Sequence, residues 1–169
     1  MPNHTSNKLT VSGPTKLVTR FKFDNAGKNV EESISFEKAL PTPSEHIGDN
    51  AIKDGKMPDW YAWRVENWGT KWDAYDTCEW EGNSIKFFTA WSPPIAWLRE
   101  IALKYPELSF QLDYADEGGG FVGTMEAQGP YGEGVSEWDW NSKEGKALRR
   151  GLGYDYDLEE DDDEISLEA

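Results

Sequence analysis

The residues that most often carry covalent or acid–base catalysis are scarce in this 169-residue chain. It contains two histidines, His4 and His46, and one cysteine, Cys78. Sites of the Ser-His-Asp or Cys-His kind need a positioned histidine base, and we expect both histidines in solvated, irregular segments. Cys78 has no cysteine or histidine beside it in the sequence, so we expect a small strand residue. We therefore predict no catalytic residue, no metal site and no cofactor, and we expect a protein that is not an enzyme.

Carboxylates are abundant, because 32 acidic residues face 17 basic ones and the net charge is −15. Two converging carboxylates could perform glycoside-type chemistry. The candidates for such a pair are Asp73, Asp76, Asp113 and Glu117. Acids at this density also come together without any function, so the pattern does not predict a catalytic pair. The sign of the charge opposes binding to phosphates, and we predict no direct contact with nucleic acid.

The acidic residues are concentrated towards the C-terminal end of the sequence. Nine of them, and no lysine or arginine, follow Gly153. The net charge is −15 with that stretch and would be −6 without it. The stretch lacks the turn glycine and the spaced ligands of an EF-hand loop. We expect it to be disordered or loosely held and to bind a partner through its carboxylates. These carboxylates are Asp155, Asp157, Glu159, Glu160, Asp161, Asp162, Asp163 and Glu164.

Tryptophan is the other unusual residue type, with nine in the chain and seven of them between residues 60 and 97. They gather around two blocks, 66–73 (ENWGTKWD) and 89–94 (TAWSPP). Ser92 is predicted to cap the start of a helix, and helix N-termini favour anions such as a phosphate or nucleotide-like group. One hypothesis is therefore a ligand pocket. Its lining would be Trp63, Asn67, Trp68, Lys71, Trp72, Trp91 and Ser92.

Three interpretations of the tryptophans stay open at the level of sequence. They can build the core and fasten an inserted segment to it, with each indole N–H bonded to a partner. They can form an exposed aromatic patch for a protein partner. They can also form an RNA-stacking surface on a sheet, which the negative charge opposes. If Asn67 and Ser92 bond only to backbone groups, the two blocks are structural and line no pocket.

Hydrophobic periodicity and turn residues predict the elements that position these side chains. Pro14 suits the first turn of a helix, and Gly69 suits the end of one. In the first half we predict a strand over 8–12, a helix over 14–24, an extended segment over 33–40, a connector over 41–58 and a helix over 58–68. In the second half we predict a hairpin of 75–80 with 85–90, a helix over 92–104, a strand over 108–112, a hairpin of 121–128 with 135–140, and a helix over 142–152.

This order predicts an α+β fold of the split βαβ, or ferredoxin-like, plan. An antiparallel sheet would be covered by two helices, with an inserted Trp-rich helix and an extra C-terminal hairpin. We divide the chain into a flexible N-terminus (1–6), a ferredoxin-like domain (7–140) with an insertion at about 25–72, and a short helix with an acidic tail (141–169). No apolar run approaches the roughly 20 residues of a membrane-spanning helix, and the polar N-terminus does not resemble a secretory signal.

The blocks 66–73 and 89–94 resemble the YubB-type ferredoxin-like domain family of phage, prophage and plasmid proteins. The segments 9–14, 105–110, 114–116 and 120–123 fit the same pattern. The similarity covers about residues 7–140, varies near 25–58 and excludes the acidic end after Asn141. It implies the ferredoxin-like fold and a mobile-element origin, but it supplies no reaction and no catalytic residues.

Two functions follow as hypotheses. The first is a non-enzymatic mobile-element protein whose acidic surface binds a basic, nucleic-acid-handling site of a host protein. An anti-restriction or anti-CRISPR inhibitor that mimics DNA would be such a protein. The alternative is a small-ligand-binding or enzymatic domain with a pocket at 67–73 and Ser92. A single cysteine fits a reducing compartment, so we expect the bacterial host cytoplasm, with no membrane contact; the sequence leaves the oligomeric state open.

Overall fold

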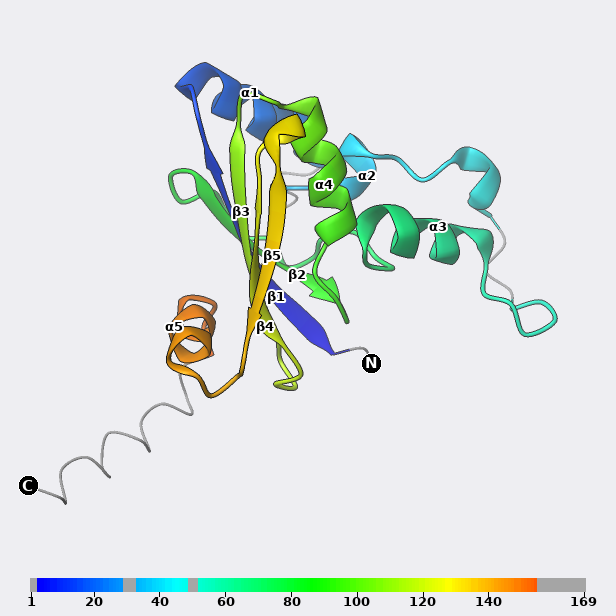
Figure 1. Cartoon of the computed structure of the whole chain (residues 1–169). Coiled ribbons are helices and arrows are strands. Elements are labelled where there is room, and N and C mark those ends of the chain that lie inside the picture. Colours follow the sequence, from blue (N-terminus) through cyan, green and yellow to red (C-terminus); the bar gives the residue numbers. More distant parts are fainter. Residues whose placement is uncertain (1–2, 29–32, 49–51, 155–169) are drawn as a thin grey trace, which may run out of the picture.

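The computed structural model describes residues 3–28, 33–48 and 52–154, which form an α+β fold on one antiparallel sheet. The strand order is β2-β1-β3-β4-β5, so the first strand lies inside the sheet and the last forms an edge (Figure 1). The strands are β1 (His4–Ser12), β2 (Ser84–Ala90), β3 (Ser109–Asp116), β4 (Val122–Ala127) and β5 (Glu133–Trp138). The helices are α1 (Thr15–Asp24), α2 (Phe36–Ala39), α3 (Asp59–Trp68), α4 (Ile95–Lys104) and α5 (Lys143–Gly151), with short 3-10 turns η1 (Ser44–His46) and η2 (Gly129–Tyr131).

One face of the sheet carries the main hydrophobic core. Leu9 of β1 and Leu112 of β3 are paired in register, and both are fully buried in this core. The helices α1 and α4 cover it with Phe21, Trp97 and Ile101, which are also fully buried. Burial of each such side chain contributes roughly 1.5–3 kcal/mol, so this cluster is the main source of stability.

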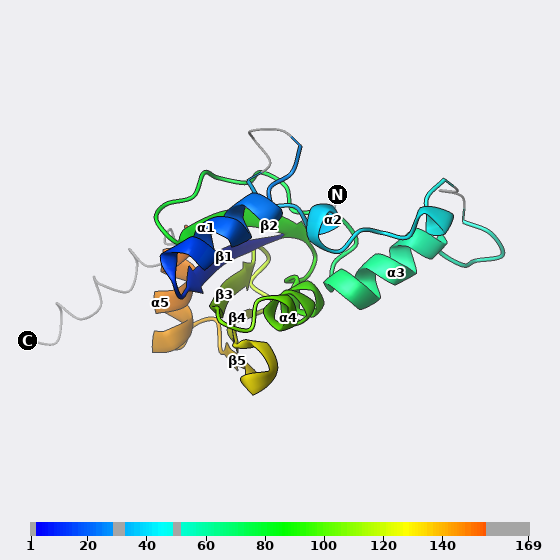
Figure 2. The same ribbon diagram turned by 90° about the horizontal axis from the view of Figure 1, so that it is seen from above.

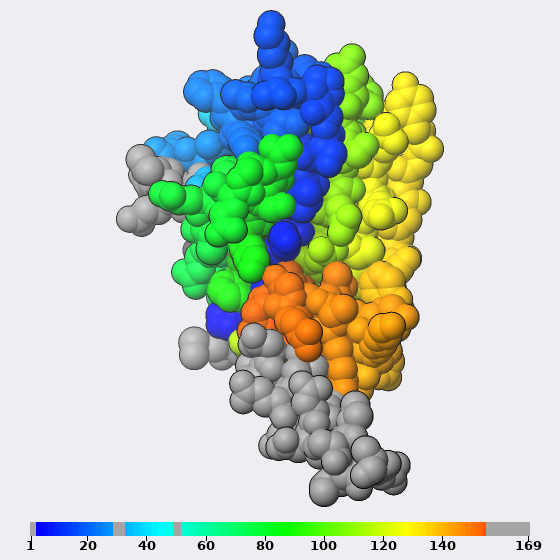
Figure 3. Space-filling view, turned by 90° about the vertical axis from the view of Figure 1, so that its left-hand side faces the viewer, coloured from blue at the N-terminus to red at the C-terminus, as the bar shows by residue number. Residues whose placement is uncertain are grey.

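On the opposite face of the sheet, α5 covers a part and no other described helix packs there. Figure 2 shows α4 and α5 on opposite sides of the sheet. Leu152 packs there against Ala115 and Val122, and the Ser6 hydroxyl donates a hydrogen bond of 3.3 Å to the Leu152 carbonyl. In Figure 3, α5 (orange) lies across the lower part of this face while β1, β3 and β4 are uncovered above it. We call this uncovered part the open face.

The predicted fold class is confirmed, with one change in the sheet. Residues 75–80 do not form a regular strand, although they lie along β2. The backbones of Tyr75 and Phe88 exchange hydrogen bonds of 3.1 and 2.9 Å, and the Cys78 N–H donates to the Lys86 carbonyl at 2.9 Å. The segment therefore takes the place of the first strand of the predicted hairpin, and α3 projects from the sheet as the predicted Trp-rich insertion (Figure 1).

The prediction of an extended segment over 33–40 is wrong. Residues 36–39 form the short helix α2, which begins after Ser35. The Ser35 hydroxyl accepts a hydrogen bond of 3.2 Å from the Lys38 N–H, which is an N-cap. The alternation of Ile34 and Phe36 is explained by burial of both side chains in the core rather than by a strand.

Other boundaries move by a few residues. The first strand begins at His4, so residues 4–6 belong to the sheet rather than to a flexible N-terminus. The helix expected from Ser92 begins at Ile95, and Ser92 does not cap it. The predicted last helix is present, and Ser142 caps it, with its hydroxyl accepting from the Gly145 N–H at 3.0 Å.

Candidate functional site

The polar side chains around Trp68 bond to the backbone. The indole N–H of Trp68 donates to the Leu40 carbonyl at 2.9 Å, and the Asn67 amide donates to the Trp63 carbonyl at 2.9 Å. Trp68 itself is fully buried. These contacts fasten the inserted segment to the core, as one interpretation of the tryptophans predicts, and they leave Asn67 facing its own helix rather than a ligand.

The junction between the two tryptophan blocks is closed in the same way. The Ser92 hydroxyl donates to the Gly69 carbonyl at 2.5 Å, and the Thr70 hydroxyl donates to the Ala90 carbonyl at 2.9 Å. Gly69 ends α3 with a φ of 85°, and a Cβ there would lie 3.1 Å from the Pro93 carbonyl. Ser92 and Thr70 thus hold the end of α3 against the end of β2, and the predicted pocket residues Asn67, Trp68 and Ser92 all bond to backbone groups, which favours the structural interpretation.

The Asp73 carboxylate is hydrogen-bonded to residues at the start of helix α2. It accepts hydrogen bonds from the Ser35 hydroxyl at 2.7 Å and from the N–H groups of Phe36 and Glu37 at 2.6 and 3.3 Å. Burial raises the pKa of Asp73, and these hydrogen bonds, with one from the Ala74 N–H, oppose the rise. The carboxylate anchors the start of α2 and is not available as half of a catalytic pair.

Trp72 and Trp91 of the two blocks are turned outward, with Lys71 between them. The Lys71 ammonium lies 4.2 Å from the centroid of the Trp72 ring and 3.7 Å from that of Trp91. The two tryptophans are 40% and 47% exposed. A cation near an indole face is attracted to it by roughly 0.5–1 kcal/mol at an exposed site, so Lys71 restrains both rings in their exposed positions.

Trp91 also has an unusual backbone conformation. Its φ is 68°, which bulky residues rarely adopt. The Trp91 N–H donates to the Asn3 carbonyl at 3.0 Å, and the Ser92 N–H donates to the Ala90 carbonyl at 2.9 Å. These bonds hold the strained backbone in place beside the first residues of the sheet. Strain of this kind costs on the order of 1–3 kcal/mol and is found most often at functional sites.

Three more rings continue the aromatic surface behind Trp72. The centroids of Trp72 and Tyr75 are 6.4 Å apart, and Phe88 lies 6.2 Å from Tyr75 and 5.6 Å from His4. A hydrogen bond of 2.6 Å joins His4 Nδ1 and the Tyr75 hydroxyl. We define the aromatic platform as Trp72, Trp91, Tyr75, Phe88, His4 and the enclosed Lys71.

Two carboxylates border the platform. Burial, followed by the negative charges of Glu117 and Asp76, raises the pKa of Tyr75 to about 12. Both acids were candidates for a carboxylate pair, but the other two lie elsewhere. Asp73 caps α2, and Asp113 accepts from Gln111 at 3.0 Å and from the Thr124 hydroxyl. The four acids therefore do not converge on one site.

Some tryptophans build the core, as the first interpretation predicts, and others form an exposed patch, as the second predicts. Trp68 and Trp97 are fully buried, and the Trp80 indole donates to the Ser33 carbonyl at 3.3 Å. The expectation that each indole N–H finds a partner is wrong for Trp60 and Trp97, whose buried Nε1 atoms have none. Trp63 packs at the edge of the core and does not reach the platform.

The open face does not favour stacking with RNA bases. Its middle row, from β2 to β4, is Lys86, Lys8, Asp113 and Thr124, and none of these is aromatic. Phe88 lies at the platform end, and Trp138 packs in the small cluster with α5. The charged and hydroxyl-bearing row lacks the rings on which unpaired bases stack.

The part of the chain that the structure describes holds neither a metal site nor a membrane-spanning helix. No group of three or more histidine, cysteine, aspartate or glutamate side chains there could hold a metal ion. No helix within that part is long and apolar enough to cross a membrane. The predicted acidic tail, Asp155 to Glu164, lies outside the described residues.

The sheet order and the covering helices define a ferredoxin-like α+β domain. Residues 67–166, more than half of the chain, match the family described as the ferredoxin-like domain in Api92-like protein. The chain therefore belongs to this family, whose description states no activity. No curated protein and no solved structure matches it significantly.

The matched span differs from the expected one. It begins at Asn67, inside the first tryptophan block, and it continues to residue 166. The acidic end after Asn141, which we expected outside the shared pattern, thus lies within the family. The first strand and α1 lie outside the match, although they complete the sheet and its core.

Proposed function

We propose that the protein is a non-enzymatic interaction protein that binds a basic surface of a partner protein through the aromatic platform. The observation that carries this proposal is the pair of exposed, restrained indoles of Trp72 and Trp91, in a platform whose Tyr75 lies within the field of Asp76 and Glu117. Tryptophan and tyrosine are enriched at binding hot spots, where large rigid rings bury much area at little entropic cost.

The charge of the chain selects the partner. With a net charge of −15, the protein attracts basic surfaces and accelerates encounter with them. An arginine of the partner can stack on an indole and pair with a carboxylate at the same time. The platform combines these two contacts, whereas the hydrogen-bonded half of the tryptophan blocks offers neither.

A more specific form of the proposal names the partner class. The basic surface would belong to a nucleic-acid-handling protein of a bacterial host, and the protein would act as an anti-restriction or anti-CRISPR inhibitor that mimics DNA. The acidic residues 155–164 would add to the contact with the phosphate-binding site. The negative charge and the resemblance to phage and plasmid proteins support this form.

Affinity capture from bacterial lysate, followed by titration of the purified partner, tests the proposal. We expect the affinity to fall steeply between low and moderate salt, because attraction between exposed charges is screened. The variant Asp76→Asn/Glu117→Gln should bind more weakly than the matched variant Glu66→Gln/Glu100→Gln. Both variants remove two negative charges, and Glu66 and Glu100 are exposed on α3 and α4.

Two results would count against the proposal. Binding that does not respond to salt would exclude an electrostatic interaction. Equal binding by the two double variants would show that total charge matters and that the platform is not the contact.

A further inference from the structure

The two edges of the sheet differ. Beside β2, the edge is occupied by residues 75–78, which bond to Phe88 and Lys86. At the other side, β5 pairs only with β4, and Glu133 to Glu137 are all exposed. Figure 1 shows α5 beyond the C-terminal end of β5. Within the described residues, β5 is therefore the edge that can accept another strand.

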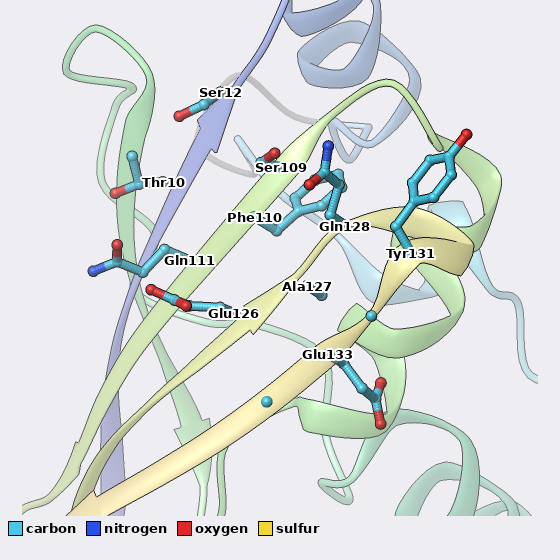
Figure 4. A pocket seen from close by; sticks show the side chains of 12 residues that line it. Thr10, Ser12, Ser109, Phe110, Gln111, Glu126, Ala127, Gln128, Tyr131 and Glu133 are labelled. Carbon is cyan, nitrogen blue, oxygen red and sulfur yellow. The ribbon is translucent and has the colours of Figure 1, made fainter.

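The start of β5 has free space around it. A Cβ added at Gly132 or at Gly134 would meet nothing within 4 Å. A groove of about 530 Å³ opens there, lined among others by Glu126, Gln128 and Tyr131. Figure 4 shows Glu126 extending to one side of the strands, while Tyr131 and Glu133 extend to the other. The start of β5 therefore has open space beside it on the open face of the sheet.

The strand has few of the features that block edges in other proteins. Exposed edges are commonly protected by proline, lysine, a bulge or a covering helix. The sequence of β5 is EGVSEW, which contains neither proline nor lysine. Its only charged residues are Glu133, which pairs with Arg99 of α4, and Glu137, so the remaining negative charge favours a basic segment over an acidic one.

These charges alternate with an apolar residue along one face. Val135 is paired in register with the buried Met125, so Glu133, Val135 and Glu137 lie on the helix-covered face. Val135 is 46% exposed. Arg99 Nε donates to Glu133 Oε1 at 2.6 Å, and the Tyr114 hydroxyl donates to Glu137 at 3.2 Å. The two carboxylates are thereby held in fixed positions on either side of Val135.

The charge pattern decides between three possible occupants. The chain's own residues 155–164 contain acids and no base, so they would be repelled. A second copy paired about Val135 would place Glu133 opposite Glu137, and like charges in opposite positions are destabilising. A basic segment would place cations opposite both carboxylates.

We infer that β5 accepts an extended basic segment of a protein partner as a sixth strand of the sheet. The segment carries a cation, an apolar residue and a cation at alternate positions, facing Glu133, Val135 and Glu137. Backbone hydrogen bonds supply affinity, and the alternate side chains supply specificity. The inference rests on the proposed function, since it names a second surface for a basic partner.

A synthetic peptide with the central sequence Arg-Thr-Val-Thr-Arg tests the inference. We expect it to bind the full-length protein, with NMR shift changes concentrated in β5 and slowed hydrogen exchange along that strand. A control peptide of the same composition, with its two arginines adjacent, should bind less well. The variant Val135→Lys should weaken binding of the first peptide about tenfold, because the lysine would lie opposite the peptide's valine and between its two arginines.

The matched control is Val65→Lys, which replaces another exposed valine, on α3, by a cation and should retain more of the affinity for the peptide. Thermal unfolding of each variant confirms that it is folded. The inference is overturned if the first peptide does not bind, if the two peptides bind equally, or if Val135→Lys binds as wild type does. A basic partner that still binds Val135→Lys at full strength in a salt-dependent way would overturn the inference and leave the proposed function intact.

Discussion

The two tryptophan blocks divide into an inward half and an outward half. Trp68 is fully buried and its indole N–H is bonded, whereas Trp72 and Trp91 are 40% and 47% exposed on either side of Lys71. The inward half joins α3 to the end of β2, and the outward half presents rings to solvent. One residue type therefore stabilises the fold in one half and forms a surface in the other, and substitutions should separate the two effects.

The largest expected effect is on the inward half. Trp68→Ala should lower the free energy of unfolding by about 3–5 kcal/mol, because a large buried ring is lost and a cavity remains. Trp72→Ala should lower it by less than about 1 kcal/mol. Chemical denaturation of both variants measures the difference. Similar losses for the two tryptophans would contradict the division.

Gly69→Ala tests the junction between the halves. The φ of 85° and the Pro93 carbonyl 3.1 Å from an added Cβ should make this change cost about 1–3 kcal/mol. Gly151→Ala is the control, because no atom lies within 4 Å of a Cβ at that position and its φ is not positive. If Gly69→Ala unfolds at the same denaturant concentration as Gly151→Ala, then neither the positive φ nor the Pro93 carbonyl requires a glycine at position 69.

Ser92→Ala removes the hydrogen bond to the Gly69 carbonyl and should cost about 1 kcal/mol. Ser12→Ala, at an exposed position near the end of β1, should leave the unfolding free energy nearly unchanged. Differential scanning calorimetry of both variants compares them. A larger effect for Ser12 than for Ser92 would show that the bond does not hold the junction.

The smallest expected effect is at the platform and depends on pH. The pKa of Tyr75 is raised from 10.0 to about 12, so the folded protein favours the neutral phenol. The resulting stability is fully present below pH 10 and is lost as the pH rises to about 12. Ultraviolet titration of wild type and of Tyr75→Phe isolates this phenol. Ionisation near pH 10 in the folded state would contradict the burial and the nearby carboxylates.

Much of the fold could be predicted because its signals are local. The alternation in β1 and β3, the proline before α1 and Ser142 before α5 are all visible in the sequence and all lead to the observed elements. Helix α2 was missed because a single turn has little intrinsic stability. It is held by Asp73, 37 residues further along the chain than Phe36, and no local pattern reveals that contact.

The candidate site was predicted in part. Lys71, Trp72 and Trp91 were among the predicted pocket residues, but His4, Tyr75 and Phe88 were not. These three meet because His4 pairs in register with Ala90 while Tyr75 bonds to Phe88. The register of a sheet depends on the whole packed face, so the sequence around His4 indicated only a polar segment. The pairing also explains why this histidine lies in a strand rather than in a loop.

The division of the chain into a domain that ends at residue 140 and a helix with an acidic tail stays a prediction. Truncation after Leu152 tests the role of the acidic tail. Leu152 is buried against Ala115 and Val122, so a chain that ends there should retain the fold. A partner captured by both full-length and truncated protein would place the contact on the described surface. A partner captured only by the full chain would place it in the acidic residues 155–164.

The central claim, that contact and stability are separate functions of the two halves, is tested most directly by Trp72→Ala/Trp91→Gly. The glycine removes the Trp91 ring and accommodates the φ of 68°. Affinity for the purified basic partner should fall about thirtyfold or more, as for a hot spot, while the unfolding temperature changes little. Phe23→Ala, which removes an 81% exposed ring on α1, should bind as wild type does. Unchanged affinity of the double variant would contradict the account.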